Sequence, residues 1–367
     1  MKHILSEIRS GVGFITLNRH EALNALSLEM VNELGRLLSI WKANSSVQAV
    51  AIRGSTKKGP FGNFCAGGDI RFFHMAGCSG DNQLDEFFTA EYRLNHLIFT
   101  YPKPYIAFLD GIVMGGGMGI SQGASLRIVT ERTKMAMPET NIGFFPDVGG
   151  GFFLSRCPGN LGEYLGLTGQ LLIGNDSLFA GLADHVVDSE SLDQLWKNLS
   201  DSSIRGVDDR LSHLKSQLEN QSPVESWPKW WDGRINNVFA MNSIQEMVDS
   251  LSNMGEGWPA EVLSVLMQRS PLMLHVTLAQ IRRARTMSLA DDLRMERVLV
   301  HNCFYTEHLG RSGVTSETVE GIRALVIDKD LKPQWNPSRI DQVTAEMVEP
   351  FFESPWSAEK HPLSDLV

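Results

Sequence analysis

The chain has 367 residues, a mass of 40.8 kDa, a formal net charge of −10 and an isoelectric point near 5.5. Its length suits one large domain with a smaller one, or two ordinary domains, and its 43% apolar and 21% charged residues exclude a disordered or fibrous protein. The acidic balance argues against a general affinity for nucleic acid or for an anionic membrane, so we expect neither as a partner.

The N-terminal residues and the cysteines bear on the compartment. The stretch "MKHILSEIRSGVGFITLNR" mixes charged and apolar residues from its start, unlike a signal or transit peptide. No apolar run approaches the roughly 20 residues that are needed to span a membrane. The four cysteines are scattered without a CxxC pair, which favours free thiols and predicts no metal ligands. We therefore expect a cytoplasmic protein, or a mitochondrial matrix protein only if a presequence is missing.

Up to about residue 200, strand-like runs alternate with helical ones. Residues 12–17, 47–54 and 104–111 are continuous apolar runs of the kind found in buried strands, and residues 26–43 and 85–100 have helical periodicity. This alternation predicts βα units and an α/β layer.

Beyond residue 200 the sequence predicts helices. Apolar residues recur at three- and four-residue spacing in 204–220, 243–255, 259–270, 271–287 and 289–309. An aromatic-rich connector at 222–239 has tryptophans that we expect to pack onto the first domain. The expected organisation is a catalytic core at 1–200 and a helical region at 201–367 that covers a pocket, contacts another copy, or both.

Two glycine-bearing loops follow strand-like runs. In "FGNFCAGGDIRFF" (61–73), two glycines allow a close approach of the backbone to a ligand, and Asp69 can cap the next helix. In "DGIVMGGGMGISQG" (110–123), three consecutive glycines at a helix start present unpaired amides. Each loop alone is also compatible with a tight turn. Neither is a phosphate loop, and Ser121 does not lie in a GxSxG elbow.

A third loop, "AMPETNIGFFPDVGGGFFLSR" (136–156), places Glu139 and Asp147 among apolar residues. No Lys, Arg or His stands between Lys134 and Arg156 to neutralise them. An ionised carboxylate is costly to bury unless it is paired or well hydrogen-bonded, so these acids are either exposed turn residues or members of a site. The residues alone leave both interpretations open.

The three loops, in this order and spacing, resemble the crotonase family, also called the enoyl-CoA hydratase/isomerase family. The resemblance starts at "LNRHEALNALSLEM" (17–30) and continues through "FCAGGDI", "GIVMGGGMGIS", "AMPETNIGFFPDVGGG" and "LTGQLLIGNDSLFAGLADHVV". "FFTAEYRLN" and the C-terminal "EGIRALVIDKDLKPQW" are similar to thioester hydrolases of the family and extend the resemblance over nearly the whole chain. It implies an α/β fold, a crotonase-like spiral of ββα units followed by a mostly helical C-terminal region.

The resemblance also implies how an acyl-CoA thioester is bound. The backbone amides of Gly68 and Gly116 would hold its carbonyl oxygen, and one well-placed donor of this kind is worth roughly 3 to 4 kcal/mol. An arginine would contact the phosphates of coenzyme A, and backbone would enclose the rest of that molecule. These implied contacts fall on Arg19, Ala25, Ala66 and Ile70. Coenzyme A is part of the substrate, so no separate cofactor is expected.

The acids distinguish the reactions of this family. A hydratase uses two glutamates, one just after the glycine triplet, where this chain has Gly119, and one at Glu139. The missing carboxylate disfavours hydration. Glu139 would instead act as general base for water or as a nucleophile that forms a mixed anhydride. Asp147 would bind the substrate hydroxyl, or orient water and assist departure of the thiol, and Glu91 would contact the hydroxyl or support the other acids.

Three functions therefore stand side by side. The favoured one, which the resemblance implies, is a thioester hydrolase that acts on 3-hydroxyisobutyryl-CoA, an intermediate of valine catabolism, and on 3-hydroxypropionyl-CoA. The second is an enoyl-CoA hydratase or isomerase. The third is a non-catalytic member of the family that serves as a binding or assembly subunit, against which the intact glycines and the three acids count. A homo-oligomer is a further expectation from the resemblance.

Overall fold

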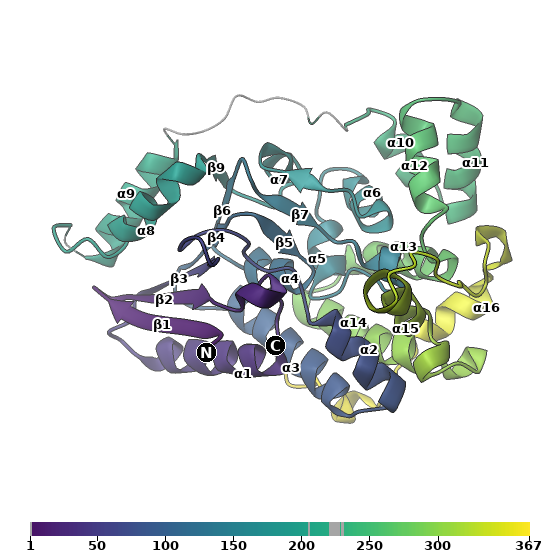
Figure 1. Ribbon diagram of the computed structural model, residues 1–367, viewed down its shortest axis with the longest axis horizontal. Helices are drawn as coiled ribbons and strands as arrows, with labels where there is room; N and C mark the ends of the chain where they lie inside the picture. Colours follow the sequence, from purple (N-terminus) through teal and green to yellow (C-terminus); the bar gives the residue numbers. More distant parts are fainter. Residues whose placement is uncertain (1, 205, 220–227, 229–230) are drawn as a thin grey trace. The chain divides into compact units, whose positions relative to one another are not determined.

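The computed structural model, drawn in Figure 1, describes residues 2–204, 206–219, 228 and 231–367. The chain divides into two compact units. Unit 1 consists of Met1–Gly68, Arg93–Ala136 and Leu171–Pro228, and unit 2 of Asp69–Tyr92, Met137–Gln170 and Lys229–Val367. Helix α3 (Gln83–Phe99) contributes residues to both. The expectation for the connector tryptophans lies largely outside the described residues.

Unit 1 contains a six-stranded sheet in the order β1-β2-β3-β4-β6-β9. Strand β1 is antiparallel to β2, and the other neighbouring pairs are parallel. The register pairs Phe14 with Ala51, and Ala51 with Ile106. The strands of this sheet are Ile4–Arg9 (β1), Val12–Leu17 (β2), Ala49–Gly54 (β3), Tyr105–Leu109 (β4), Leu126–Thr130 (β6) and His185–Val187 (β9).

A second, three-stranded sheet of unit 1 has the order β5-β7-β8. Its strands are Ile112–Met114 (β5), Lys134–Ala136 (β7) and Leu172–Ile173 (β8), with β5 parallel to β7 and β7 antiparallel to β8. The helices of unit 1 are Leu28–Ala43 (α1), Gly116–Gln122 (α4), Asn175–Phe179 (α7), Leu192–Asn198 (α8) and Val207–Glu219 (α9).

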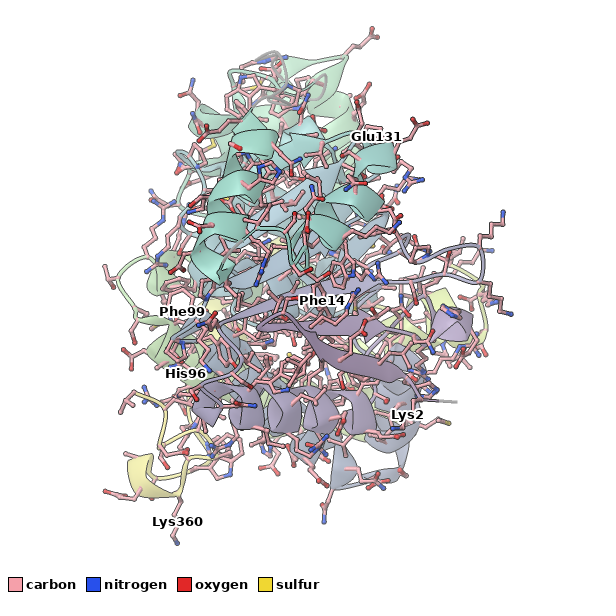
Figure 2. The ribbon with its side chains drawn as sticks, turned by 90° about the vertical axis from the view of Figure 1, so that its left-hand side faces the viewer. Lys2, Phe14, His96, Phe99, Glu131 and Lys360 are labelled. Atoms are coloured by element: carbon pink, nitrogen blue, oxygen red, sulfur yellow. The ribbon has the colours of Figure 1, made fainter. Side chains whose placement is uncertain are left out.

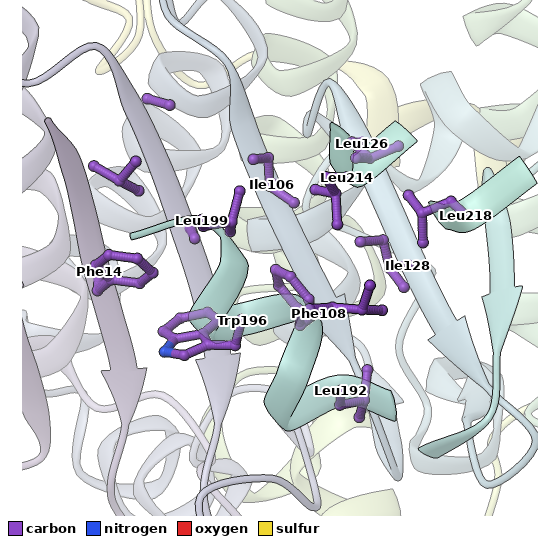
Figure 3. Packing of buried hydrophobic residues seen from close by; sticks show 14 of the residues in the cluster. Phe14, Ile106, Phe108, Leu126, Ile128, Leu192, Trp196, Leu199, Leu214 and Leu218 are labelled. Carbon is purple, nitrogen blue, oxygen red and sulfur yellow. The ribbon is translucent and has the colours of Figure 1, made fainter. Parts of the chain in front are cut away.

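The core of unit 1 follows from the alternation of side chains along the strands. Phe14 of β2, labelled in Figure 2, packs on Trp196 of α8 with ring centroids 4.8 Å apart. Residues of β3, β4, β6, β9, α8 and α9 also belong to this apolar cluster, part of which Figure 3 shows. The adjacent Gly13 points to the opposite face, where a Cβ would lie 2.5 Å from the ring of Trp41 in α1. Both faces of the sheet are thus covered, which explains the continuous apolar runs of its parallel strands.

Unit 2 is helical over the residues that the structure describes. Serine side chains cap the starts of four of its helices, because Ser243, Ser270, Ser288 and Ser316 each accept an N–H three residues further on. Its α-helices are Ile70–Ser79 (α2), Gly150–Leu154 (α5), Leu161–Thr168 (α6), Ile235–Phe239 (α10), Ile244–Met254 (α11), Trp258–Leu266 (α12), Pro271–Ala284 (α13), Leu289–Phe304 (α14), Glu317–Ile322 (α15) and Ala345–Val348 (α16).

The expected α/β fold with a helical C-terminal region is confirmed, and the runs at 12–17, 47–54 and 104–111 form β2, β3 and β4. The boundary expected at residue 200 differs from the division into units. Helix α5 packs against α13 and α14, and α2 packs against α15, so two early segments belong with the C-terminal helices. Strand β1 was not expected, because most of its side chains are exposed and carry no apolar pattern.

Within the described part of the chain, no single helix has the length and apolar character that crossing a membrane requires. Helices α12 and α13 pass that test only when taken together, and they are bent by 107° relative to each other.

Candidate active site

In unit 1, the loop that holds Gly68 is joined to two other segments. The Leu26 amide donates to the carbonyl of Gly67 over 2.8 Å. The Cys65 amide donates to Ile112 of β5 over 2.9 Å, and the Met114 amide donates back to Cys65 over 3.0 Å. The loop therefore lies beside both the segment at residue 26 and the strand that leads into α4.

The two glycines expected to hold a carbonyl oxygen both have available amides. Neither Gly68 nor Gly116 donates its N–H to an acceptor in the part of the chain that the structure describes. Gly116 is the buried first residue of α4, where unpaired amides are normal. A Cβ at the following Gly117 would lie 2.4 Å from the carbonyl oxygen of Cys65, so only glycine permits this close approach.

The residues expected to contact coenzyme A fall into both units. In unit 1, Arg19 Nη1 donates to the carbonyl of Ala25 over 3.0 Å, and the Ala66 amide donates to Leu23 over 3.1 Å. Arg19, Ala25 and Ala66 therefore belong to one set of linked loops. Ile70 is the first residue of α2 in unit 2, which Asp69 caps as expected, with Oδ1 accepting an N–H over 3.3 Å. These assignments stay predictions.

In unit 2, Glu139 and Asp147 lie on consecutive turns. Glu139 begins a 3₁₀ turn that ends at Gly143, whose φ is 66°. A Cβ at Gly143 would lie 2.3 Å from the carbonyl oxygen of Glu317, so the turn requires glycine there. Glu139 is 7% exposed and Asp147 6% exposed. The interpretation of these acids as exposed turn residues is therefore wrong, because both side chains are buried.

Helix α3 brings Glu91 and Tyr92 to the same cluster. The Tyr92 hydroxyl donates to Asp147 Oδ2 over 3.0 Å. Glu91 is 1% exposed, and its Oε1 has no hydrogen-bond partner among the described residues, as is also true of Glu139 Oε2. Aromatic rings surround the group, with Phe88 6.2 Å from Tyr92 and 6.0 Å from Phe144 between ring centroids. The acids thus lie in an apolar setting.

This setting changes the acidity of the cluster. Burial raises the pKa of Glu91 and of Glu139 well above the ordinary value, and the nearby Asp147 adds a like charge that raises both further. Burial raises the pKa of Asp147 to about 7, although the hydrogen bond from Tyr92 acts in the opposite direction. A carboxyl group with the pKa of Asp147 can exchange a proton with water near neutral pH.

A second pair of buried acids, Asp292 and Glu296, lies one turn apart on α14 and was missed in the sequence. Both are fully buried, and burial raises the pKa of Asp292 to about 7 and that of Glu296 well above the ordinary value. They occupy the apolar face that Leu289, Leu293 and Val300 define at helical spacing. Two acids on that face were the available signal.

The geometry supports proton transfer by carboxyl groups. Among the described residues, no group of three or more His, Cys, Asp and Glu side chains is placed to hold a metal ion. The acids of unit 2 can accept or donate protons, and the free amides of unit 1 can stabilise a developing oxyanion. Each capacity by itself is one that chemistry at a carbonyl carbon requires.

Comparisons with known proteins identify relatives over nearly the whole chain. The family model described as enoyl-CoA hydratase/isomerase matches residues 12–352. The protein named 3-hydroxyisobutyryl-CoA hydrolase, mitochondrial, of Gallus gallus is 39% identical over 95% of this chain and 88% of its own length. Its counterpart of Homo sapiens is 36% identical over 98% of this chain and 90% of its own length.

Solved structures share the fold over the whole chain or nearly all of it. A crystal structure titled carnitinyl-CoA dehydratase from Mycobacterium thermoresistibile has a TM-score of 0.83 and 33% identity, covering 100% of this chain and 99% of that one. One titled enoyl-CoA hydratase from Rhodobacter sphaeroides has a TM-score of 0.80 and 32% identity over 96% and 98% of the two chains. These matches extend through the C-terminal helices.

Proposed function

This chain belongs to the enoyl-CoA hydratase/isomerase family, and we propose that it is a coenzyme A thioester hydrolase whose substrate is 3-hydroxyisobutyryl-CoA. The names of the curated relatives support both the hydrolysis and the substrate, which belongs to valine degradation. We propose 3-hydroxypropionyl-CoA as a further substrate, because it keeps the 3-hydroxyl group and lacks only a methyl branch.

The observation that carries this proposal is the state of Glu139. Its carboxyl group is buried, carries a raised pKa, and has one oxygen without a partner among the described residues. A structural carboxylate would be paired, because an unpaired buried charge destabilises a fold. Unpaired polar atoms are instead expected where a protein receives a substrate or a water molecule.

In the proposed reaction, water replaces the thiol at the carbonyl carbon of the substrate. Ionised Glu139 either takes a proton from the attacking water or attacks the carbon itself and forms a mixed anhydride that water then opens. The carbon–sulfur bond breaks, and coenzyme A leaves as its thiol after gaining a proton. The amides of Gly68 and Gly116 stabilise the negative charge on the carbonyl oxygen. Asp147 binds the 3-hydroxyl group or protonates the departing thiolate.

Hydration of enoyl-CoA is the second candidate, because the two solved structures with the same fold are titled as a dehydratase and a hydratase. Helix α4, of which the structure describes every residue, has Gly119 where a hydratase of this family has its other glutamate, and contains no carboxylate at all. An acid/base pair for hydration would lack that member. This difference favours hydrolysis.

One pair of assays separates the two candidates. The purified protein is mixed with 3-hydroxyisobutyryl-CoA and a thiol reagent, and with crotonyl-CoA while the enoyl absorbance is followed. Hydrolysis predicts thiol release from the first compound and a constant absorbance with the second. Loss of enoyl absorbance without thiol release would identify a hydratase, and silence in both assays would favour a non-catalytic member.

Two further properties are separate predictions. The relatives are named as mitochondrial proteins, which is in tension with the cytoplasmic expectation, and cell fractionation of the tagged protein decides the compartment. A homo-oligomer stays a prediction from the family, and light scattering of the purified chain measures it.

A further inference from the structure

The turn that carries Asp147 is held by two buried polar side chains from the C-terminal helices. Gln280 of α13 donates from Nε2 to the carbonyl of Pro146 over 2.6 Å, directly before Asp147. Glu296 of α14 accepts the Gly149 amide at Oε2 over 2.7 Å and the Gly151 amide at Oε1 over 3.0 Å. The two side chains thus bond the backbone on both sides of Asp147.

The two side chains are also bonded to each other. Gln280 Nε2 donates to Glu296 Oε1 over 3.0 Å, and both residues have no solvent exposure. Burying such groups is costly, and apolar side chains of similar size pack at least as well in most cores. A polar pair aimed at one backbone turn therefore indicates that the position of that turn matters.

The backbone of the turn shows why it needs holding. Val148, which follows Asp147, has a φ of 56°, in the left-handed region that a β-branched residue rarely adopts. Such a conformation persists only where the surrounding structure enforces it. The bonds to Pro146 and Gly149 bracket Val148 and supply that enforcement.

We propose that Gln280 and Glu296 are positioning residues, which hold the strained turn so that the Asp147 carboxyl group stays at the Tyr92 hydroxyl and in its working place. This inference rests on the proposed function, because Asp147 is the residue that would act on the substrate. Helices α13 and α14 then contribute to the catalytic rate as well as to the packing of unit 2.

The kinetic test is a double-mutant cycle of Glu296→Gln with Asp147→Asn, read as the kcat of thiol release. The amide of glutamine replaces one acceptor with a donor and breaks one of the two backbone bonds. We expect Glu296→Gln to lower kcat about tenfold or more with little change in KM, since a shift of about 1 Å can cost about 100-fold. In the Asp147→Asn background the same change should cost less than about twofold, because its effect passes through Asp147.

A merely structural role would lower the active fraction by the same factor in both backgrounds, and that additive result would overturn the proposal. Glu163→Gln is the matched control, because Glu163 is a buried glutamate of unit 2 whose hydrogen bond goes to Arg285 and not to the turn. It should leave the kcat of both backgrounds within about twofold of its starting value, as expected for an independent site.

A second measurement follows the titration of the Asp147 carboxyl group in the absence of substrate. Its result separates failure of the positioning role from failure of the proposed function. Carbon-13 NMR of labelled aspartate, assigned with Asp147→Asn, follows the Asp147 carboxyl group in wild type and in Gln280→Leu. The hydrogen bond from Tyr92 lowers the Asp147 pKa, so a released turn should raise it by at least about 0.5, whereas Glu163→Gln should not.

The Gln280→Leu change leaves the titratable groups around Asp147 in place, so a changed titration does not come from a lost charge. These groups are Glu91, Tyr92, Glu139, Glu296 and Cys303. An Asp147 titration that is identical in wild type and Gln280→Leu would overturn the positioning role whether or not the protein hydrolyses a thioester. Absence of thiol release by the wild type would overturn the proposed function alone.

Discussion

Asp110 of unit 1 and the acid cluster of unit 2 bury their carboxyl groups in different ways. In unit 1, Asp110 is 1% exposed and forms an ion pair with Arg132, and the Thr130 hydroxyl donates to it over 2.7 Å. In unit 2, Glu91, Glu139 and Asp147 are also buried, yet no cation among the described residues pairs with them. The first arrangement stabilises a loop, and the second raises pKa values.

The difference shows that burial of an acid does not by itself mark a reactive group. What marks it is the absence of compensation, since the cost of an unpaired buried charge is otherwise removed by pairing or by mutation to an apolar residue. Unit 1 offers neutral backbone amides that do not titrate, and unit 2 offers carboxyl groups that do. Variants of the two units should therefore differ in how their effects depend on pH.

The largest effect is expected from Glu139→Gln. This change removes the only group proposed as base or nucleophile, so thiol release should fall by about a thousandfold or more, in the upper range for an acid/base group. Binding of the acyl-CoA, measured by calorimetry, should be nearly intact, because the glutamine side chain has nearly the same shape as that of glutamate. Glu163→Gln is the control, since that buried glutamate pairs with Arg285. Full activity of Glu139→Gln would remove Glu139 from the mechanism.

Gly116→Val should have the next largest effect. The added side chain would obstruct the Gly116 amide, and loss of one oxyanion donor costs about 100- to 1000-fold in kcat. Because no titrating group is involved, the factor should be equal at pH 6 and pH 8. Gly35→Val on α1 is the control, because nothing lies within 4 Å of a Cβ there. An unchanged rate in Gly116→Val would show that the oxyanion is bound elsewhere.

Asp147→Asn should weaken turnover less, by roughly 10- to 100-fold, as expected for a supporting acid. It should also reduce selectivity for hydroxylated acyl chains. Rates on 3-hydroxyisobutyryl-CoA and isobutyryl-CoA measure this selectivity. If wild type and variant show the same ratio of these rates, Asp147 does not bind the 3-hydroxyl group.

The same variant should change the pH dependence of stability. The pKa of Asp147 is raised from 3.8 to about 7 in the folded chain, so its contribution to stability is fully present below pH 4 and is lost as the pH rises through 7. Denaturant unfolding should therefore show Asp147→Asn gaining about 1 kcal/mol or more relative to wild type between pH 5 and pH 8. A difference that does not depend on pH would contradict the raised pKa.

Tyr92→Phe should have the smallest effect, a fall in kcat of about two- to fivefold, in line with the loss of one hydrogen bond. Its hydroxyl lowers the pKa of Asp147, so its removal should move the Asp147 titration upward. Tyr101→Phe is the control, because the Tyr101 hydroxyl bonds Leu38 in unit 1. A downward movement of the Asp147 titration in Tyr92→Phe would contradict the assigned bond.

Much of the fold could be predicted from local patterns. The sequence alone predicts strands β2, β3 and β4 and helices α1, α13 and α14, because apolar runs and helical spacing are properties of short segments. Strand β1 is not predicted, because its residues are mostly exposed. The division into units depends on contacts between distant segments, such as α2 with α15, which no local pattern contains.

The site residues also differ in whether the sequence predicts them. Glu139 and Asp147 stood out because no cation lies near them in the sequence, and the structure adds that both are buried. Glu91 was expected through the family resemblance, since an acid on an amphipathic helix is ordinary. Tyr92 and Glu296 were missed, because their importance lies in bonds to Asp147 and to its turn across 55 and 147 positions of the chain.

The most direct test of the central claim is the pH dependence of kcat/KM for thiol release from 3-hydroxyisobutyryl-CoA by the wild type. Catalysis by an unpaired buried carboxyl group predicts that kcat/KM rises from pH 5 to pH 7, with a midpoint above the ordinary glutamate value of 4.5, because Glu139 must lose its proton to act. A profile that is flat or falls over this range, or the absence of thiol release, would contradict the claim.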